Sequence, residues 1–214
     1  NFIDNCLRIL VFMRFILGKK IGMTQVFSED GNVVPVTLVQ AGPCIVTAIR
    51  VSDKDKYQAV QIGFDSKKKV NKPQKGQLKD LGNFKYLKEF RTDNLENYKI
   101  GDKIGISIFK KGESVDVSSV SIGKGFQGVV KRHHFRGHPA THGHKDQSRM
   151  SGSIGATGPQ RVLKGTRMAG RMGGERVTVK NLEIVDIDTE KNFLFINGAI
   201  AGGENALLEI RTKN

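Results

Sequence analysis

Residues 121–176, SIGKGFQGVVKRHHFRGHPATHGHKDQSRMSGSIGATGPQRVLKGTRMAGRMGGER, determine how this chain has to be organised. They hold 11 Lys and Arg against two acidic residues, together with 12 of the chain's 25 glycines and all five of its histidines. Phe126 and Phe135 are the only aromatic residues of the Phe, Tyr and Trp type in this segment. A segment with so few large apolar side chains cannot bury a core of its own. We therefore predict a coreless insertion carried by a separate folded domain.

The rest of the chain is balanced in charge and apolar enough to fold. Of 35 Lys and Arg and 21 Asp and Glu in 214 residues, the 158 residues outside the segment carry 24 and 19. About two thirds of the net charge of +14 therefore lies in about a quarter of the chain. With 38% apolar residues, a buried core is expected and wholesale disorder is excluded. The excess positive charge indicates a polyanionic partner.

The flanking sequence predicts mainly β-structure, arranged as a barrel or sandwich. Short runs rich in Val, Ile and Phe predict strands at residues 24–27, 33–40, 44–51, 57–64, 103–109, 115–120, 177–179, 183–187, 193–196 and 207–211. Residues 28–32, which contain Asp-Gly, predict a hairpin loop, and Pro35 predicts an edge or bulge. Short helices are predicted at 81–90 and 128–134, and a solvated loop at 67–69 and 71–76. We place the β-domain at residues 13–120 and 177–214, and the inserted arm at 121–176.

Few features of the sequence point to catalysis, a metal or a membrane. Gly123–Gly128 fits the dinucleotide pattern G-x-G-x-x-G, but Asp146, about 20 residues on, ends no apolar strand. Three histidines, His138, His142 and His144, have spacing that resembles that of metal ligands. The only nearby carboxylate is that of Asp146, and the many surrounding cations would repel a divalent metal ion. Cys6 and Cys44 form no paired motif, and no apolar run reaches the ~20 residues of a membrane span.

RNA binding accounts for the unusual features of the segment together. Lys and Arg neutralise phosphates, and glycine lets the backbone approach them closely. Histidine and arginine side chains can also stack on bases. The scarcity of aromatic residues argues against a recognition domain built on a stacking platform. For Lys67–Lys69, a solvated surface is the simpler interpretation.

Three motifs in order closely resemble those of the bacterial-type large-subunit ribosomal protein of the universal L-three family. They are LGKKIGMTQVF at 17–27, GKGFQGVVKR at 123–132 and KGTRMAGRMGGERVTV at 164–179, and the resemblance extends from about Met13 to Arg211. It implies a translation-protein-like β-barrel with a long, glycine-rich, basic extension inserted between strands. Residues 1–12 fall outside the resemblance and are expected to form a dispensable N-terminal extension.

The resemblance also implies a function. The chain would be a structural constituent of the large ribosomal subunit, supporting assembly and the architecture near the peptidyl transferase centre. Its partners would be large-subunit rRNA and neighbouring large-subunit proteins, with no cofactor, metal, small-molecule substrate or membrane. The expected location is the ribosome, in the cytoplasm or in an organelle of bacterial descent. Two alternatives stay open: a nucleotide- or metal-dependent enzyme, and a regulatory protein that binds messenger RNA or DNA outside the ribosome.

The predicted site residues are the cations, histidines and one amide of the arm, with two lysines of the first motif. As rRNA-binding residues we expect Lys19, Lys20, Lys124, Gln127, Lys131, Arg132, His133, His134, Arg136, His138, His142, His144, Lys145, Arg149, Arg161, Lys164, Arg167, Arg171 and Arg176. The arm tip near the peptidyl transferase centre would be Gly152, Ser153, Ile154, Gly155, Ala156, Thr157 and Gly158. No residue is expected to be catalytic.

Overall fold

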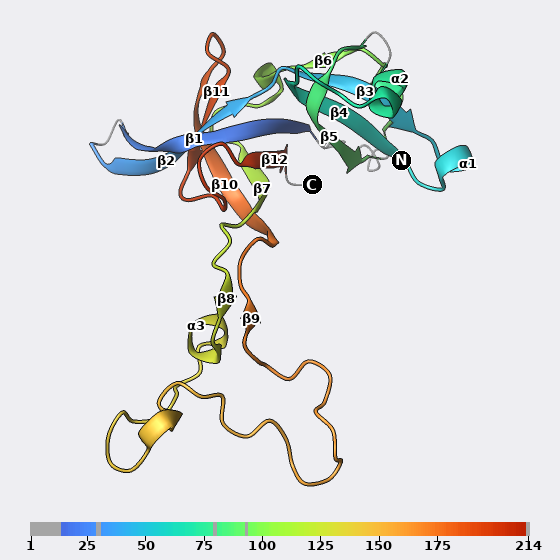
Figure 1. Cartoon of the computed structure of the whole chain (residues 1–214). Helices are drawn as coiled ribbons and strands as arrows, with labels where there is room; N and C mark the ends of the chain where they lie inside the picture. The colour runs from blue at the N-terminus through green and yellow to red at the C-terminus, as the bar shows by residue number, and fades with distance from the viewer. Residues whose placement is uncertain (1–13, 29–30, 79–80, 93, 213–214) are drawn as a thin grey trace, which may run out of the picture. The chain divides into compact units, whose positions relative to one another are not determined.

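The computed structural model describes residues 14–28, 31–78, 81–92 and 94–212, so the extension expected at residues 1–12 lies outside the described residues. The chain divides into two compact units (Figure 1). The first, which we call the barrel unit, runs up to Ser119 and resumes at Val177, and the second, the arm unit, is Val120–Arg176.

The barrel unit is built on a closed six-stranded barrel, which confirms the mainly β fold predicted from the sequence. Around the barrel the strands follow the order β1-β12-β7-β10-β11-β2. They span Phe15–Phe27 (β1), Leu207–Thr212 (β12), Ser114–Val120 (β7), Arg176–Asp188 (β10), Phe193–Asn197 (β11) and Val33–Ala41 (β2). Full closure leaves the barrel without open edges along its paired regions. The two strands that flank the arm unit in sequence, β7 and β10, are neighbours in this order.

The predicted hairpin between β1 and β2 is present. Phe27 pairs with Val33, and the Ser28 N–H donates to the Asn32 carbonyl at 2.9 Å. Pro35 pairs with Gln25 of β1, and its carbonyl accepts a hydrogen bond from the Gly198 N–H, just beyond β11, at 2.8 Å. It therefore lies where the pairing of β2 with β11 ends, and not on an open edge.

A second, four-stranded sheet packs beside the barrel and was not anticipated. Its order is β5-β4-β3-β6, with strands Phe84–Arg91 (β5), Ala59–Ser66 (β4), Cys44–Arg50 (β3) and Lys103–Ile104 (β6). Phe15 joins the two sheets, because its ring stacks on Phe90 at 4.5 Å and on Tyr98 at 5.6 Å. One continuous core of buried residues therefore runs from the barrel into the second sheet.

Several predictions of local structure were wrong. The helix predicted at 81–90 is strand β5, in which Phe84 and Phe90 are buried. The run 103–109 is a strand only to Ile104 and continues as the 3₁₀ helix η2, Ile106–Ile108. A helix, α2 at Lys72–Leu78, replaces the predicted loop, and the two runs at 177–179 and 183–187 belong to the single strand β10. A further short helix, α1, spans Ser52–Asp55.

The arm unit contains little regular structure. Its elements are β8 at Phe126–Gln127, α3 at Val129–His133, the 3₁₀ helix η3 at Lys145–Gln147, and β9 at Gly170–Arg171. Within residues 120–176, all of which the structure describes, Val129 is the only buried residue. Among the described helices of the whole chain, none is long and apolar enough to cross a membrane.

Candidate nucleic-acid interface

The two ends of the arm unit are held together by an antiparallel ladder. The Ser121 N–H donates to the Glu175 carbonyl at 2.9 Å, and the Lys124 N–H donates to the Met172 carbonyl at 2.9 Å. The ladder continues into β8 and β9, where Phe126 pairs with Arg171. The segment therefore leaves and returns as a paired neck, although its sequence has no alternating apolar pattern.

Gly173 makes this neck possible. Its backbone has φ +73°, and a Cβ at this position would clash with the Ile122 carbonyl oxygen. Both facts exclude an ordinary L residue, because a positive φ is strained for a side chain and the contact is with backbone. Sequence reasoning did not single out Gly173, since the need for glycine there depends on the facing residue Ile122, which lies 51 positions earlier in the chain.

Helix α3 confirms the short helix expected at 128–134, and it is fastened to the returning strand. The Arg132 guanidinium donates to the Met168 carbonyl at 2.8 Å, and His133 Nε2 lies 3.0 Å from the same oxygen. Both side chains are half-buried. Of the predicted RNA-binding residues, these two therefore also position the arm's own backbone.

The glycine motif at 123–128 does not form a dinucleotide site. Phe126–Gln127 pairs antiparallel with Gly170–Arg171, whereas that site needs a strand, a helix and a parallel strand. The histidines also lack neighbouring residues that could complete a metal site with them. His138 and His144 stack at 5.6 Å between ring centroids, but in the described part of the chain no three His, Cys, Asp or Glu residues could hold a metal ion.

The distal part of the arm is open to solvent throughout. Every residue from 149 to 169 is exposed. The predicted tip contains one local turn, in which Ser153 Oγ donates to the Gly155 carbonyl at 2.9 Å, and beside it Ile154, Pro159 and Arg161 line a shallow groove of about 260 Å³. Such a backbone has much of its hydrogen-bonding capacity available to another molecule.

The barrel unit contains several ion pairs, whereas the basic side chains from Lys124 to Arg171 of the arm form none with a described carboxylate. None of the ten basic side chains between Lys124 and Arg171 forms an ion pair with a described carboxylate, and nine of the ten residues are exposed. In the barrel unit, Arg14 pairs with Glu113, and Lys88 pairs with Glu209 at 3.0 Å. The arm therefore presents a dense positive charge to solvent.

The two lysines predicted outside the arm have partners within the barrel unit. Lys19 forms an ion pair with Asp65 at 2.6 Å, and its hydrogen bond lowers the pKa of that carboxyl group. The Lys20 ammonium donates to the carbonyls of Ile200 and Gly202 at 2.8 and 3.2 Å. Both side chains therefore contribute to the stability of the barrel unit, and their contact with RNA stays a prediction.

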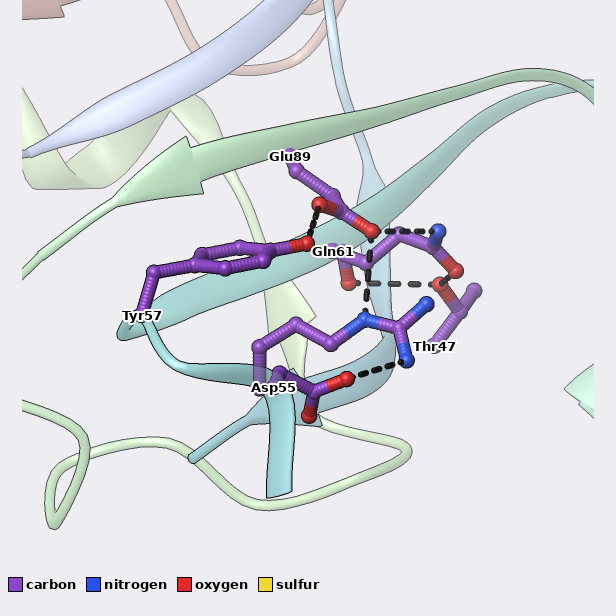
Figure 2. A network of polar contacts seen from close by, with 6 residues as sticks. Thr47, Asp55, Tyr57, Gln61 and Glu89 are labelled. Atoms are coloured by element: carbon purple, nitrogen blue, oxygen red, sulfur yellow. Dashed lines mark hydrogen bonds and ion pairs between the residues drawn. The ribbon is translucent and has the colours of Figure 1, made fainter. Parts of the chain in front are cut away.

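A second group of charges, on the four-stranded sheet, is satisfied internally (Figure 2). The Glu89 carboxylate accepts hydrogen bonds from Tyr57 at 2.8 Å, from Gln61 at 3.2 Å and from Arg50 at 3.3 Å. Its hydrogen bonds raise the pKa of Arg50 and of Tyr57. Arg50 also pairs with Asp55 at 3.3 Å, so this cation is neutralised where it stands.

A folded β-barrel that carries an exposed insertion dense in basic side chains and poor in acidic ones is typical of proteins that bind a polyanion. The model of the family described as "Ribosomal protein L3" matches residues 79–192, which include the whole arm unit. The chain is 51% identical over 199 residues to "Large ribosomal subunit protein uL3" of Herpetosiphon aurantiacus, covering 91% of this chain and 94% of the relative. The protein of the same name from Dehalococcoides mccartyi is 50% identical over 197 residues, covering 92% and 96%. The chain belongs to the ribosomal protein L3 family.

Proposed function

We propose that this chain is a structural constituent of the large ribosomal subunit, in which residues 121–176 form an arm that binds ribosomal RNA. As a member of a family of structural ribosomal proteins, it is not an enzyme. Its place of action is the ribosome, in the cytoplasm, and its partners are rRNA and other large-subunit proteins.

One observation carries this proposal: ten consecutive basic side chains of the arm have no described carboxylate partner, although the chain holds 21 Asp and Glu. Like charges held this close repel one another, and an exposed cationic arm is stabilised when phosphates replace the missing carboxylates. The lack of a buried core in residues 120–176 points the same way, because such a segment gains its fixed shape from a partner.

The parts of the arm have different roles in this proposal. The exposed cations from Lys124 to Arg171 contact phosphates, and His138 and His144 add planar surfaces next to them. The uncharged residues 152–158 carry small side chains except for Ile154, and they enter the narrowest space, next to the peptidyl transferase centre. The barrel unit anchors the arm and supplies the surface for neighbouring proteins during assembly.

The test is to cross-link the arm inside intact large subunits. A photoreactive benzoylphenylalanine replaces Val162 of the arm, and the control carries it in place of Val51 of the barrel unit. These positions are matched, since each valine is 43% exposed. We expect the first chain to sediment with the large subunit and to form an RNA adduct on irradiation, with a much weaker RNA adduct from the control. A chain that sediments apart from the large subunit, or an equal RNA adduct at both positions, would refute the proposal.

A further inference from the structure

The hairpin of β1 and β2 extends beyond the barrel as a two-stranded ribbon. Strand β12 pairs with β1 only from Phe15 to Lys19, and β11 pairs with β2 only from Val36 to Gln40. The last bonds on the β12 side of β1 are the two made by Lys20, with Ala206 and Asn205 at 3.1 and 2.7 Å. From there to Phe27, this edge of β1 has no bonded neighbour among the described residues, so its N–H and C=O groups are free to pair.

The ribbon also exposes large apolar side chains. Phe27 is directly paired with Val33, so both lie on one face of the ribbon, and they are 67% and 52% exposed. Met23, four residues before Phe27 and on the same face, is 51% exposed. A groove of about 480 Å³ beside the ribbon is lined by Val26, Phe27 and Val34 together with Lys111 and residues of β10. An exposed apolar cluster of this kind marks an interaction site.

The charge of residues 21–49 argues against RNA as the partner of the ribbon. Residues 21–49 contain no Lys, Arg or His, and they include two acidic residues, Glu29 and Asp30, in a chain whose net charge is +14. RNA affinity rests on phosphate neutralisation, which this stretch cannot supply. The exposed apolar residues of the arm differ in this respect, since Phe126 follows Lys124 by two positions and Leu163 precedes Lys164.

We propose that the ribbon, residues 21–28 and 31–35, is a docking surface for an extended segment of a neighbouring large-subunit protein, and that this segment is both apolar and basic. The segment adds a strand to the free edge of β1 and places apolar side chains against Met23, Phe27 and Val33, and its cations compensate the charge of Glu29 and Asp30, which follow Ser28 in the sequence. Strand addition supplies affinity through the main chain, and the apolar face and loop charge supply specificity. This inference rests on the proposed ribosomal function and names a partner class for a surface outside the arm.

A pair of matched cross-linking probes tests it in the full chain. Benzoylphenylalanine replaces Phe27 in one chain and Phe126 in the other, which are both exposed phenylalanines, at 67% and 76%. Each chain is assembled into large subunits, which are purified by sedimentation and irradiated. We expect the adduct at position 27 to survive ribonuclease and to join a peptide rich in apolar residues and Lys or Arg, and the adduct at position 126 to be RNA.

The outcomes separate this inference from the function on which it rests. Chains that are missing from the large-subunit fraction overturn both. Chains that are present but form at position 27 an RNA adduct, an adduct with an acidic peptide, or no adduct at all overturn only the docking surface. As a second measurement, the Phe27→Ser, Val33→Ser double variant should bind rRNA within about twofold of the unaltered chain but lose about tenfold in competition for subunits. A loss of rRNA affinity of similar size would overturn the docking surface.

Discussion

The salt dependence of RNA binding should report the cations of the arm and not the net charge of the chain. The perturbation is a triple substitution of Arg161, Lys164 and Arg167 by Gln, all of them exposed residues of the distal arm. The matched control replaces Lys67–Lys69 by Gln, which removes the same formal charge from exposed residues of the barrel unit. Neither triple substitution removes a buried or paired group, so both variants are expected to fold.

The size of the effect follows from the number of unpaired cations. If each of the ten basic residues from Lys124 to Arg171 neutralises one phosphate, the slope of log K against log salt concentration is about −7 to −9. Removing three of these contacts should make the slope shallower by about 2 to 3. Removing the three lysines of the control should leave the slope almost unchanged, because Lys67–Lys69 are expected to face solvent and not RNA.

The assay is fluorescence anisotropy with a labelled fragment of large-subunit rRNA, titrated at several concentrations of KCl. A slope for the unaltered chain shallower than about −3 would refute the reasoning, since the arm would then neutralise only a few phosphates. Equal changes of slope in the two triple variants would also refute it, because the effect would then come from net charge alone.

Three further predictions concern the barrel unit. Gly63→Ala should lower the free energy of unfolding by about 1–3 kcal/mol, because the added Cβ would lie 2.5 Å from the Phe84 ring. The control, Gly76→Ala in α2, should be neutral or stabilising, because its Cβ would meet nothing within 4 Å. Urea unfolding measures the stability of both variants. Cys44 is fully buried, and burial raises the pKa of its thiol to about 12. In a chain that lacks the other cysteine, Cys6, we therefore expect iodoacetamide at pH 8 to label Cys44 only after unfolding. Mass spectrometry detects the label. Because its pKa is lowered, the Asp65 carboxylate stabilises the fold through its ion pair above about pH 4, and this stabilisation is lost as the pH falls further. Asp65→Asn should therefore lower the free energy of unfolding by at most about 1 kcal/mol at pH 6 and hardly at all near pH 2. Thermal unfolding at the two pH values measures the difference.

The barrel could be predicted where sequence signals are local. The loop with Asp-Gly fixed the β1–β2 hairpin, and short runs of branched residues indicated most strands. Strand β5 was mistaken for a helix because its partner is distant: Phe84 packs on Gly63 and Phe90 on Phe15, and neither contact is visible in a local window. Helix α2 was missed because Lys72–Leu78 contains Pro and Gly and has no apolar periodicity.

The absence of a buried core in residues 120–176 could be predicted from composition, because the lack of large apolar residues is a property of the sequence itself. What composition does not reveal is which cations already have partners. Lys19, one of the predicted RNA-binding residues, forms an ion pair with Asp65, which lies 46 positions later in the chain. Arg132, another of them, donates to the carbonyl of Met168 within the arm. Such pairings depend on the tertiary fold.

The position of β12 between β1 and β7 bears on the order of events during synthesis of the chain. The barrel cannot close on a nascent polypeptide until residues 207–212 have emerged from the ribosome, because they form β12, the last strand of the barrel to be synthesised. The cationic arm is translated before that point, while it is still tethered to the ribosome that makes it. The nascent chain therefore exposes its basic arm before the barrel has folded. In this interval a chaperone or an early contact with rRNA would protect the chain from aggregation.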